Sequence, residues 1–516
     1  MKNRELFVKD PLKLELLNQG VSRVTNARDA SEERVARFEL QTFVCDGQYA
    51  NGLTRILRSF LAQLDKPEQA AAWVSGFYGS GKSHLVKMLR LLWTNHKFSD
   101  GVTARALVSD LPAEIQDLMK ELDTEGKRLG GIHAAAGTMG EGGMRHVRLS
   151  VLSIVFRSLG LPEAFHQASF LLWLKQNGHL EKLKSHLRQN GRSLAQELPN
   201  LFVSPHLANA LLASDPSLPQ NPGDIRKLLT AQFPVRTEDI SNDQMLMAIR
   251  SALADETGRV PCTLLVLDEV QQFIAGSAQL SYDVQETAEA LCKNLGGKLL
   301  LVATGQSALT EVPNLQKLLA RFRIAVQLTD ADVDSVVRTV LLQKRADRKQ
   351  SLAELMDKCD GEISRQLAQS RIATRQEDRA FYVTDYPLLP VRRRFWERIL
   401  RAVDTLGTTA QLRSQLQIVH EANRSIAENV VGCVVACDFL YDQKAGDHTK
   451  ADAALFVSWG GFKPTVYKEL ASRFFRVRLW SQKELLEHLF ANYDRLDEDL
   501  RAELPLKRIW TVATQE

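Results

Sequence analysis

Residues 71–87 read AAWVSGFYGSGKSHLVK, and this stretch decides the fold. Within it, residues 76–83 (GFYGSGKS) match the phosphate-loop pattern G-x-x-x-x-G-K-[ST]. Residues 71–75 suit a short strand, and the apolar residues after the loop recur at helical spacing. A glycine turn between a strand and a helix directs backbone N–H groups toward an anion. The pattern and its flanks together predict an α/β P-loop NTPase fold, AAA+-like, with a parallel sheet, rather than a glycine turn without a ligand.

The residues of this loop have distinct expected roles. Lys82 should reach the β- and γ-phosphates of a nucleotide, and the Ser83 hydroxyl should bind Mg²⁺. The sequence therefore predicts ATP and Mg²⁺ as ligands. The residues expected to contact the nucleotide are Gly76, Gly79, Ser80, Gly81, Lys82, Ser83 and His84.

A second stretch, residues 262–269 (CTLLVLDE), is an apolar run that ends in two acids. Uniformly apolar residues are typical of a strand buried on both faces. In open α/β sheets, ligands bind outside the carboxyl ends of the strands. We therefore expect Asp268 to bind Mg²⁺ and Glu269 to orient and activate the attacking water. Many core strands end in acids, so the functional interpretation depends on the pairing with the phosphate loop.

Another apolar run, residues 298–306 (KLLLVATGQ), places Thr304 and Gln306 at the end of a strand next to Asp268. Both are candidate sensors of the γ-phosphate, and the alternative is a polar ending to a core strand. Arg321 precedes the last strand of the sheet, where it is either an arginine finger toward a neighbouring subunit or a surface arginine. Arg413 is a candidate lid arginine that reaches the γ-phosphate.

The chain has 516 residues, 44% of them hydrophobic, which allows several domains. A formal net charge of +4 is too small to indicate nucleic-acid binding by itself. The six cysteines are scattered, which favours free thiols in a reducing compartment. We find neither a signal peptide at the N-terminus nor a run of about 18 apolar residues. These features predict a cytoplasmic protein without a membrane partner.

The chain order suggests four parts. We expect a helical segment leading into the ATPase, the ATPase core with a helical insertion at 161–250, a helical lid, and a small α/β tail. Their expected bounds are 1–70, 71–330, 331–440 and 441–516. Two details stay open. Gln48 and Tyr49 either contact adenine or only pack, and Arg392–Arg394 form either a solvated helix face or a contact to a phosphate backbone.

A set of motifs over residues 10–440 resembles the P-loop ATPases of bacterial BREX (bacteriophage exclusion) systems, the BrxC/PglY family. The motifs are FVCDGQYANGL (43–53), WVSGFYGSGKSHLVK (73–87), LLVLDEVQQFI (264–274), LLLVATGQSAL (299–309), GEISRQLA (361–368) and DYPLLPVRRRFWERIL (385–400). The resemblance implies an AAA+-like ATPase of anti-phage defence that works with a methyltransferase and other subunits. It supports the roles given to Lys82, Ser83, Asp268 and Glu269.

The tail departs from that family. Residues 455–496 look like the later half of an Mrr-like restriction endonuclease domain. Such a domain needs an Asp and a Glu/Gln-x-Lys group for Mg²⁺. Only Asp438, Asp442, Gln443 and Lys444 lie nearby, and Gln443-Lys444 has the wrong spacing, so we expect an inactive module.

Three functions remain open from the sequence. The first is an ATPase of a BREX-like defence system, coupling ATP turnover to assembly or action on DNA, directly or through partners, as a homo-oligomer. The second is a nucleotide-dependent scaffold or sensor with little turnover. The third is an ATP-dependent restriction nuclease subunit that uses the tail.

Overall fold

The computed structural model describes most of the chain in two units, Met1–Val435 and Ala436–Glu516, and each is treated by itself. No helix among the described residues is long and apolar enough to span a membrane. The described residues are 1–17, 24, 29–76, 80–215, 217–218, 221–306, 316, 318, 321–328, 331–365, 373–403, 412–436, 439, 454–458, 460–462, 466, 477–493 and 501.

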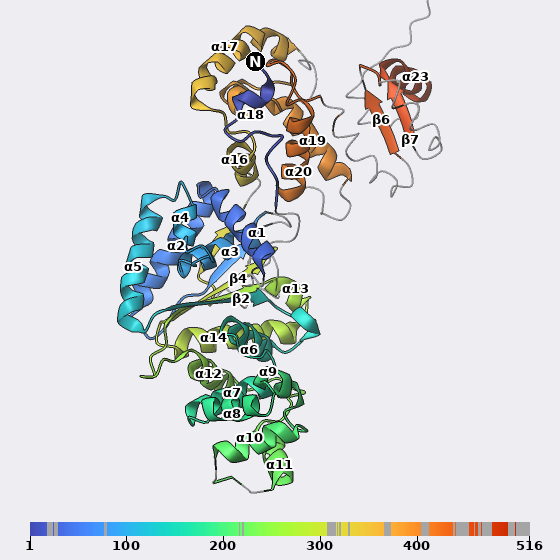
Figure 1. Cartoon of the computed structure of the whole chain (residues 1–516). Coiled ribbons are helices and arrows are strands. Elements are labelled where there is room, and N and C mark those ends of the chain that lie inside the picture. The colour runs from blue at the N-terminus through green and yellow to red at the C-terminus, as the bar shows by residue number, and fades with distance from the viewer. Residues whose placement is uncertain are drawn as a thin grey trace, which may run out of the picture. The chain divides into compact units, whose positions relative to one another are not determined.

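The described strands of the first unit form one five-stranded parallel sheet in the order β2-β3-β4-β1-β5 (Figure 1). The strands are β1 (Ala72–Ser75), β2 (Ile132–Thr138), β3 (Cys262–Asp268), β4 (Leu299–Gly305) and β5 (Ile324–Gln327). The strand that precedes the phosphate loop and the strand that carries the two acids are therefore separated by β4. The predicted parallel α/β fold is confirmed.

Helices cover both faces of this sheet, because alternate side chains of each strand point to opposite sides. One face packs against α1 (Ala30–Gln41), α2 (Gly47–Gln63), α3 (Lys82–Trp93), α4 (Ala104–Leu107) and α5 (Ala113–Leu129) (Figure 1). The other face packs against α6 (Val147–Ser158), α12 (Asn242–Leu253), α13 (Val270–Ile274) and α14 (Ala278–Asn294). A short 3₁₀ turn, η2 (Glu141–Gly143), follows β2.

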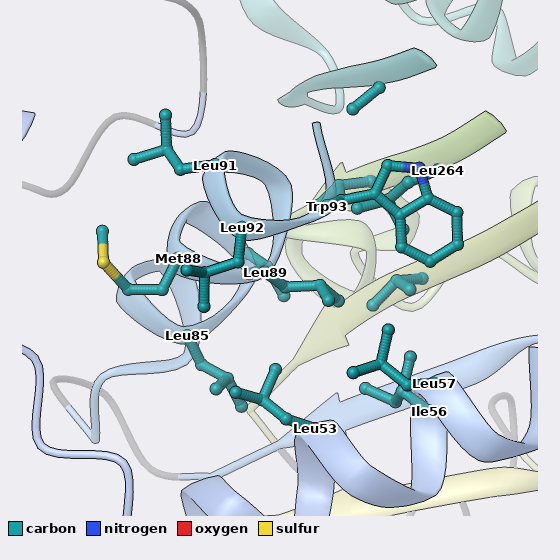
Figure 2. Close-up of a cluster of buried hydrophobic side chains, with 14 of the residues drawn as sticks. Leu53, Ile56, Leu57, Leu85, Met88, Leu89, Leu91, Leu92, Trp93 and Leu264 are labelled. Atoms are coloured by element: carbon teal, nitrogen blue, oxygen red, sulfur yellow. The ribbon is translucent and has the colours of Figure 1, made fainter. Parts of the chain in front are cut away.

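Helices α2 and α3 contribute fully buried apolar side chains to one cluster (Figure 2). Leu53, Ile56 and Leu57 recur at helical spacing and lie beside the α3 side chains Leu85 and Leu89. Burying apolar surface is worth about 25 cal/mol per Å², so this shared cluster stabilises both α2 and the helix that follows the phosphate loop.

The insertion between α6 and α12 is helical, as predicted, and has a hydrophobic cluster of its own. Phe170, Leu183 and Leu211 are fully or almost fully buried in it. Its elements are α7 (Phe165–Gln176), α8 (Leu180–Gln189), α9 (Leu194–Glu197), η3 (Leu198–Asn200), α10 (Pro205–Ser214) and α11 (Pro222–Gln232).

The lid is also helical. Its elements are α16 (Ala331–Val340), α17 (Ala346–Arg365), η5 (Gln376–Phe381), α18 (Tyr382–Asp385), α19 (Pro390–Val403) and α20 (Leu412–Ser425). The first residues of the chain, including η1 (Asn3–Leu6), pack into this lid. The Asn3 amide donates to the carbonyls of Ile426 and Cys433, both at 3.2 Å, and accepts from the Tyr386 hydroxyl at 2.6 Å. The expected helical segment 1–70 is thus corrected: its first residues belong to the lid.

The three arginines at the start of α19 have partners inside the lid. Arg393 is buried and forms an ion pair with Asp334, and Arg394 forms one with Asp378 at 2.5 Å. Arg392 donates to the carbonyl of Val435. The interpretation of a solvated helix face is therefore wrong for Arg393, because a charge run does not show which acids of other helices will face it. All three arginines thus bind other groups of the same unit.

In the second unit the described strands β6 (Ala454–Ser458) and β7 (Val477–Ser481) pair in parallel, and α23 (Gln482–Asn492) follows. This confirms the predicted small α/β module. Residues 465–475, which lie between the two strands, fall outside the described residues apart from residue 466.

Candidate nucleotide site

The phosphate loop leaves β1 and enters α3 at Gly81, which is the N-cap of that helix. Gly81 has a φ of 87°, in the left-handed region that favours glycine. At Gly76, an added Cβ would lie 2.5 Å from the Ser80 Oγ, so the loop has no room for a side chain there. The Lys82 Nζ donates to the Gly76 carbonyl at 2.8 Å across the loop. Gly79 lies outside the described residues.

Ser80 provides a direct test of whether the loop fits a phosphate. Its Oγ is buried and has no hydrogen-bond partner within the described part of the chain. A buried hydroxyl without a partner is destabilising by about 1–3 kcal/mol. A phosphate oxygen in the loop would accept a hydrogen bond from the Ser80 hydroxyl. The residues of the loop therefore fit the predicted ligand.

Lys82 is a largely buried cation that faces two acids. Burial lowers its pKa to about 8, and the carboxylates of Asp268 and Glu269 oppose that shift. The structure thus brings the loop lysine close to two acids that are distant from it in the sequence. A nucleotide phosphate in the loop would add negative charge beside this lysine and favour its charged form.

Thr304 joins the two acids. Its Oγ1 donates to the Asp268 Oδ1 at 2.5 Å and accepts from the Glu269 N–H at 2.9 Å. These contacts arise because β3 and β4 are neighbours, with Leu267 opposite Ala303 in the register. Thr304 thus orients Asp268 and fixes the backbone of Glu269, whereas its role as a γ-phosphate sensor stays a prediction.

Glu269 is the residue whose environment best suits a base. Its φ is 59°, a strained backbone conformation for a residue other than glycine, of the kind found at functional sites. Burial raises the pKa of its carboxyl, and the nearby Asp268 raises it further, while Lys82 opposes both. A raised pKa makes the carboxylate a better proton acceptor near neutral pH.

Gln306 is exposed, and its backbone N–H donates to the Gln271 side-chain Oε1 at 2.6 Å. Gln271 lies on α13, directly after the acidic pair, so this contact ties the end of β4 to the turn that carries Glu269. Gln271 was missed by the sequence analysis, because only the neighbouring position of β3 and β4 shows that it can reach Gln306.

His84 and Ser83 lie in the first turn of α3. The His84 ring packs edge-on against Phe43, with centroids 5.7 Å apart, and its Nδ1 is 4.0 Å from the Glu39 Oε1. Burial lowers the pKa of His84, which favours the neutral ring, and Glu39 opposes that shift. Glu39 also forms a buried ion pair with Lys87 at 2.5 Å. The His84 side chain thus has partners from α1, and its contact with the nucleotide stays a prediction.

The structure does not bring Arg321 to this site. Its carbonyl accepts from the Ala71 N–H at 3.1 Å, before β1 begins, which is the edge of the sheet opposite to the phosphate loop. Its guanidinium forms ion pairs with Glu68 at 3.2 Å and Glu289 at 2.7 Å. Arg321 is therefore not part of this chain's own site, and a finger role toward a neighbouring subunit stays a prediction.

Two other sets of predicted residues cannot be placed. The Arg413 side chain lies outside the described residues, although its backbone belongs to α20. The four residues considered for the nuclease module, Asp438, Asp442, Gln443 and Lys444, also lie outside them.

We expect Thr304→Val to lower ATP turnover by about 10- to 100-fold, because Asp268 then loses the hydroxyl that orients it. The substitution keeps the shape of the side chain, so the measurement is kcat in a steady-state ATPase assay. Thr287→Val on α14 is the matched control: Thr287 is buried, and its Oγ1 has no partner in the described part of the chain. An unchanged kcat in Thr304→Val would show that Asp268 keeps its orientation without Thr304.

No protein-family model matches the chain. Among solved structures, it is similar to the ORC1 protein of Aeropyrum pernix in complex with DNA, with 14% identity and a TM-score of 0.27 over 84% of this chain and 87% of that chain. It is also similar to Drosophila ORC bound to DNA, with 13% identity and a TM-score of 0.22 over 84% of this chain and 90% of that chain. At such values neither likeness carries an argument about function.

Proposed function

We propose that this chain is an Mg²⁺-dependent ATPase, an AAA+-like component of a bacterial anti-phage defence system of the BREX type. One observation supports the ATPase activity above all. Asp268, Glu269 and Thr304 meet at the carboxyl ends of β3 and β4, where the acids act electrostatically on Lys82 of the phosphate loop.

Each residue of the site has a separate role in the proposed hydrolysis. Lys82 binds the β- and γ-phosphates, and the loop N–H groups hold the triphosphate in place. Ser83 and Asp268 would hold Mg²⁺, which neutralises charge that develops on the phosphates. Glu269 accepts a proton from the attacking water, and Thr304 keeps both acids in position.

The defence role is supported by the sequence resemblance. Four of its motifs cover the start of α2, the phosphate loop, the β3–α13 turn and β4, so they include the residues of the proposed site. The other two fall in the lid. On this proposal the partners are a methyltransferase and other defence subunits, further copies of the chain, and DNA, bound directly or through those subunits.

The test is steady-state ATP hydrolysis by the purified full chain, with and without double-stranded DNA. Mg²⁺-dependent turnover is expected, and DNA should stimulate it if turnover is coupled to action on DNA. Calorimetric titration with ATP and Mg²⁺ runs in parallel. A chain that binds ATP but shows no turnover under any condition, including with its partner subunits, would instead be a nucleotide-dependent scaffold or sensor.

A further inference from the structure

Tyr49 lies directly beneath the phosphate loop. It belongs to the first turn of α2, and only 3% of its surface is exposed. Its hydroxyl donates to the Ser80 carbonyl at 2.9 Å. A Cβ added to Gly81 would lie 2.0 Å from the Tyr49 Oη, so the tyrosine also touches the loop at the next residue. The Tyr49 side chain thus packs against the loop, which favours the packing interpretation over a contact with adenine.

The hydrogen bond from Tyr49 to the Ser80 carbonyl also fixes the direction of the next backbone N–H, that of Gly81. The Ser80 carbonyl and the Gly81 N–H belong to one planar trans peptide unit, in which C=O and N–H point in opposite directions. A hydrogen bond that holds the Ser80 carbonyl toward Tyr49 therefore turns the Gly81 N–H away from Tyr49. N–H groups at the start of α3 have no partners within the helix, and they are the donors that a phosphate uses.

The tyrosine is itself held in place. Leu53 and Ile56 are fully buried on the same helix (Figure 2). A Cβ added to Gly52 would lie 2.6 Å from the Val326 Cγ1, so α2 lies directly against β5. Phe43 packs edge-on against the Tyr49 ring, with centroids 6.2 Å apart. Tyr49 is therefore a fixed support for the loop rather than an adaptable contact.

We propose that Tyr49 is a positioning residue that presets the phosphate loop for nucleotide, and so contributes to ATP affinity rather than to the hydrolytic step. The proposal rests on the proposed function, because it concerns the same site. A preset loop loses less conformational freedom when the ligand binds, and this raises affinity. The hydroxyl of Tyr49 donates to the loop backbone, whereas the acids proposed for hydrolysis are at the carboxyl end of β3.

The test is Tyr49→Phe, which removes only the hydroxyl. We expect the Kd for ATP with Mg²⁺, measured by calorimetric titration, to rise about tenfold, with a similar rise in KM. The kcat should stay within about twofold of the wild-type value, because Glu269, Asp268 and Thr304 keep their contacts. The rise in Tm on addition of ATP should be smaller than in the wild type.

Tyr386→Phe is the matched control. Tyr386 is fully buried in the lid, and its hydroxyl donates to the Asn3 Oδ1 at 2.6 Å. The same atom is removed, so both variants should lose stability, but only Tyr49→Phe should lose affinity. A wild-type Kd in Tyr49→Phe, or an equal loss in Tyr386→Phe, overturns the proposal. If the wild-type chain binds no ATP, the proposed function fails, and this inference fails with it.

Discussion

Replacing Glu269 with Gln is expected to lower the kcat for ATP hydrolysis by about 10²- to 10⁴-fold, while ATP still binds. The amide has the shape of the carboxyl group but cannot accept a proton from water. Glu269 is suited to that task because burial and the neighbouring Asp268 raise the pKa of its carboxyl. Steady-state hydrolysis measures the loss, and calorimetric titration with ATP and Mg²⁺ shows that binding is retained.

Glu256→Gln is the control for this substitution. Glu256 is exposed and precedes β3, so it lies on the amino-terminal side of the strand whose carboxyl end carries Glu269. Its replacement should leave kcat unchanged. If Glu269→Gln turned over ATP at the wild-type rate, Glu269 would not be the base, and a scaffold or sensor that needs no turnover would be favoured.

The second large effect concerns the pH dependence of ATP binding through Lys82. Burial lowers the pKa of this lysine to about 8, so in the free protein it is charged below that pH and neutral above it. Phosphates bind the charged form. The affinity for ATP should therefore be constant below pH 8 and should fall up to tenfold per pH unit above it. The terminal phosphate of ATP is already ionised in this range, so the change reports on the protein.

Lys82→Ala should weaken ATP binding by about 10- to 100-fold at pH 7 and remove the dependence on pH above 8. Lys120→Ala on α5 is the control, because the Lys120 side chain is 72% exposed and forms a surface ion pair with Asp117. Calorimetric titrations between pH 7 and about 10 give both results. A pH dependence that persists in Lys82→Ala would assign it to another group.

The parts of the fold that could be predicted from the sequence have local signals. Gly76 and Gly81 are needed by the backbone of one turn, and the apolar run before Asp268 is needed by a strand buried on both faces. Each signal lies within a few consecutive residues, so the phosphate loop, the acidic pair and the parallel sheet followed from the pattern alone.

The parts that could not be predicted depend on contacts between distant segments. The bond from Thr304 to Asp268 requires knowledge that β3 and β4 are neighbours. The bond from Tyr49 to Ser80 requires the packing of α2 beside the loop. The burial of Arg393 depends on acids from other helices of the lid. Periodicity shows that a residue is polar or apolar, but not which residue it meets.

The position of the first residues in the lid has a mechanical consequence. The chain begins in the lid, runs into the ATPase core through α1, and returns to the lid after β5. The lid is therefore joined to the core by two covalent connections. Two connections restrict the motion of the lid relative to the core more than one connection would. The lid also contacts the core directly, because the Ser335 hydroxyl of α16 donates to the Asp46 carboxylate at the start of α2. Cleavage of the chain between η1 and α1 would remove one of the two covalent restraints and leave the lid residues themselves unchanged.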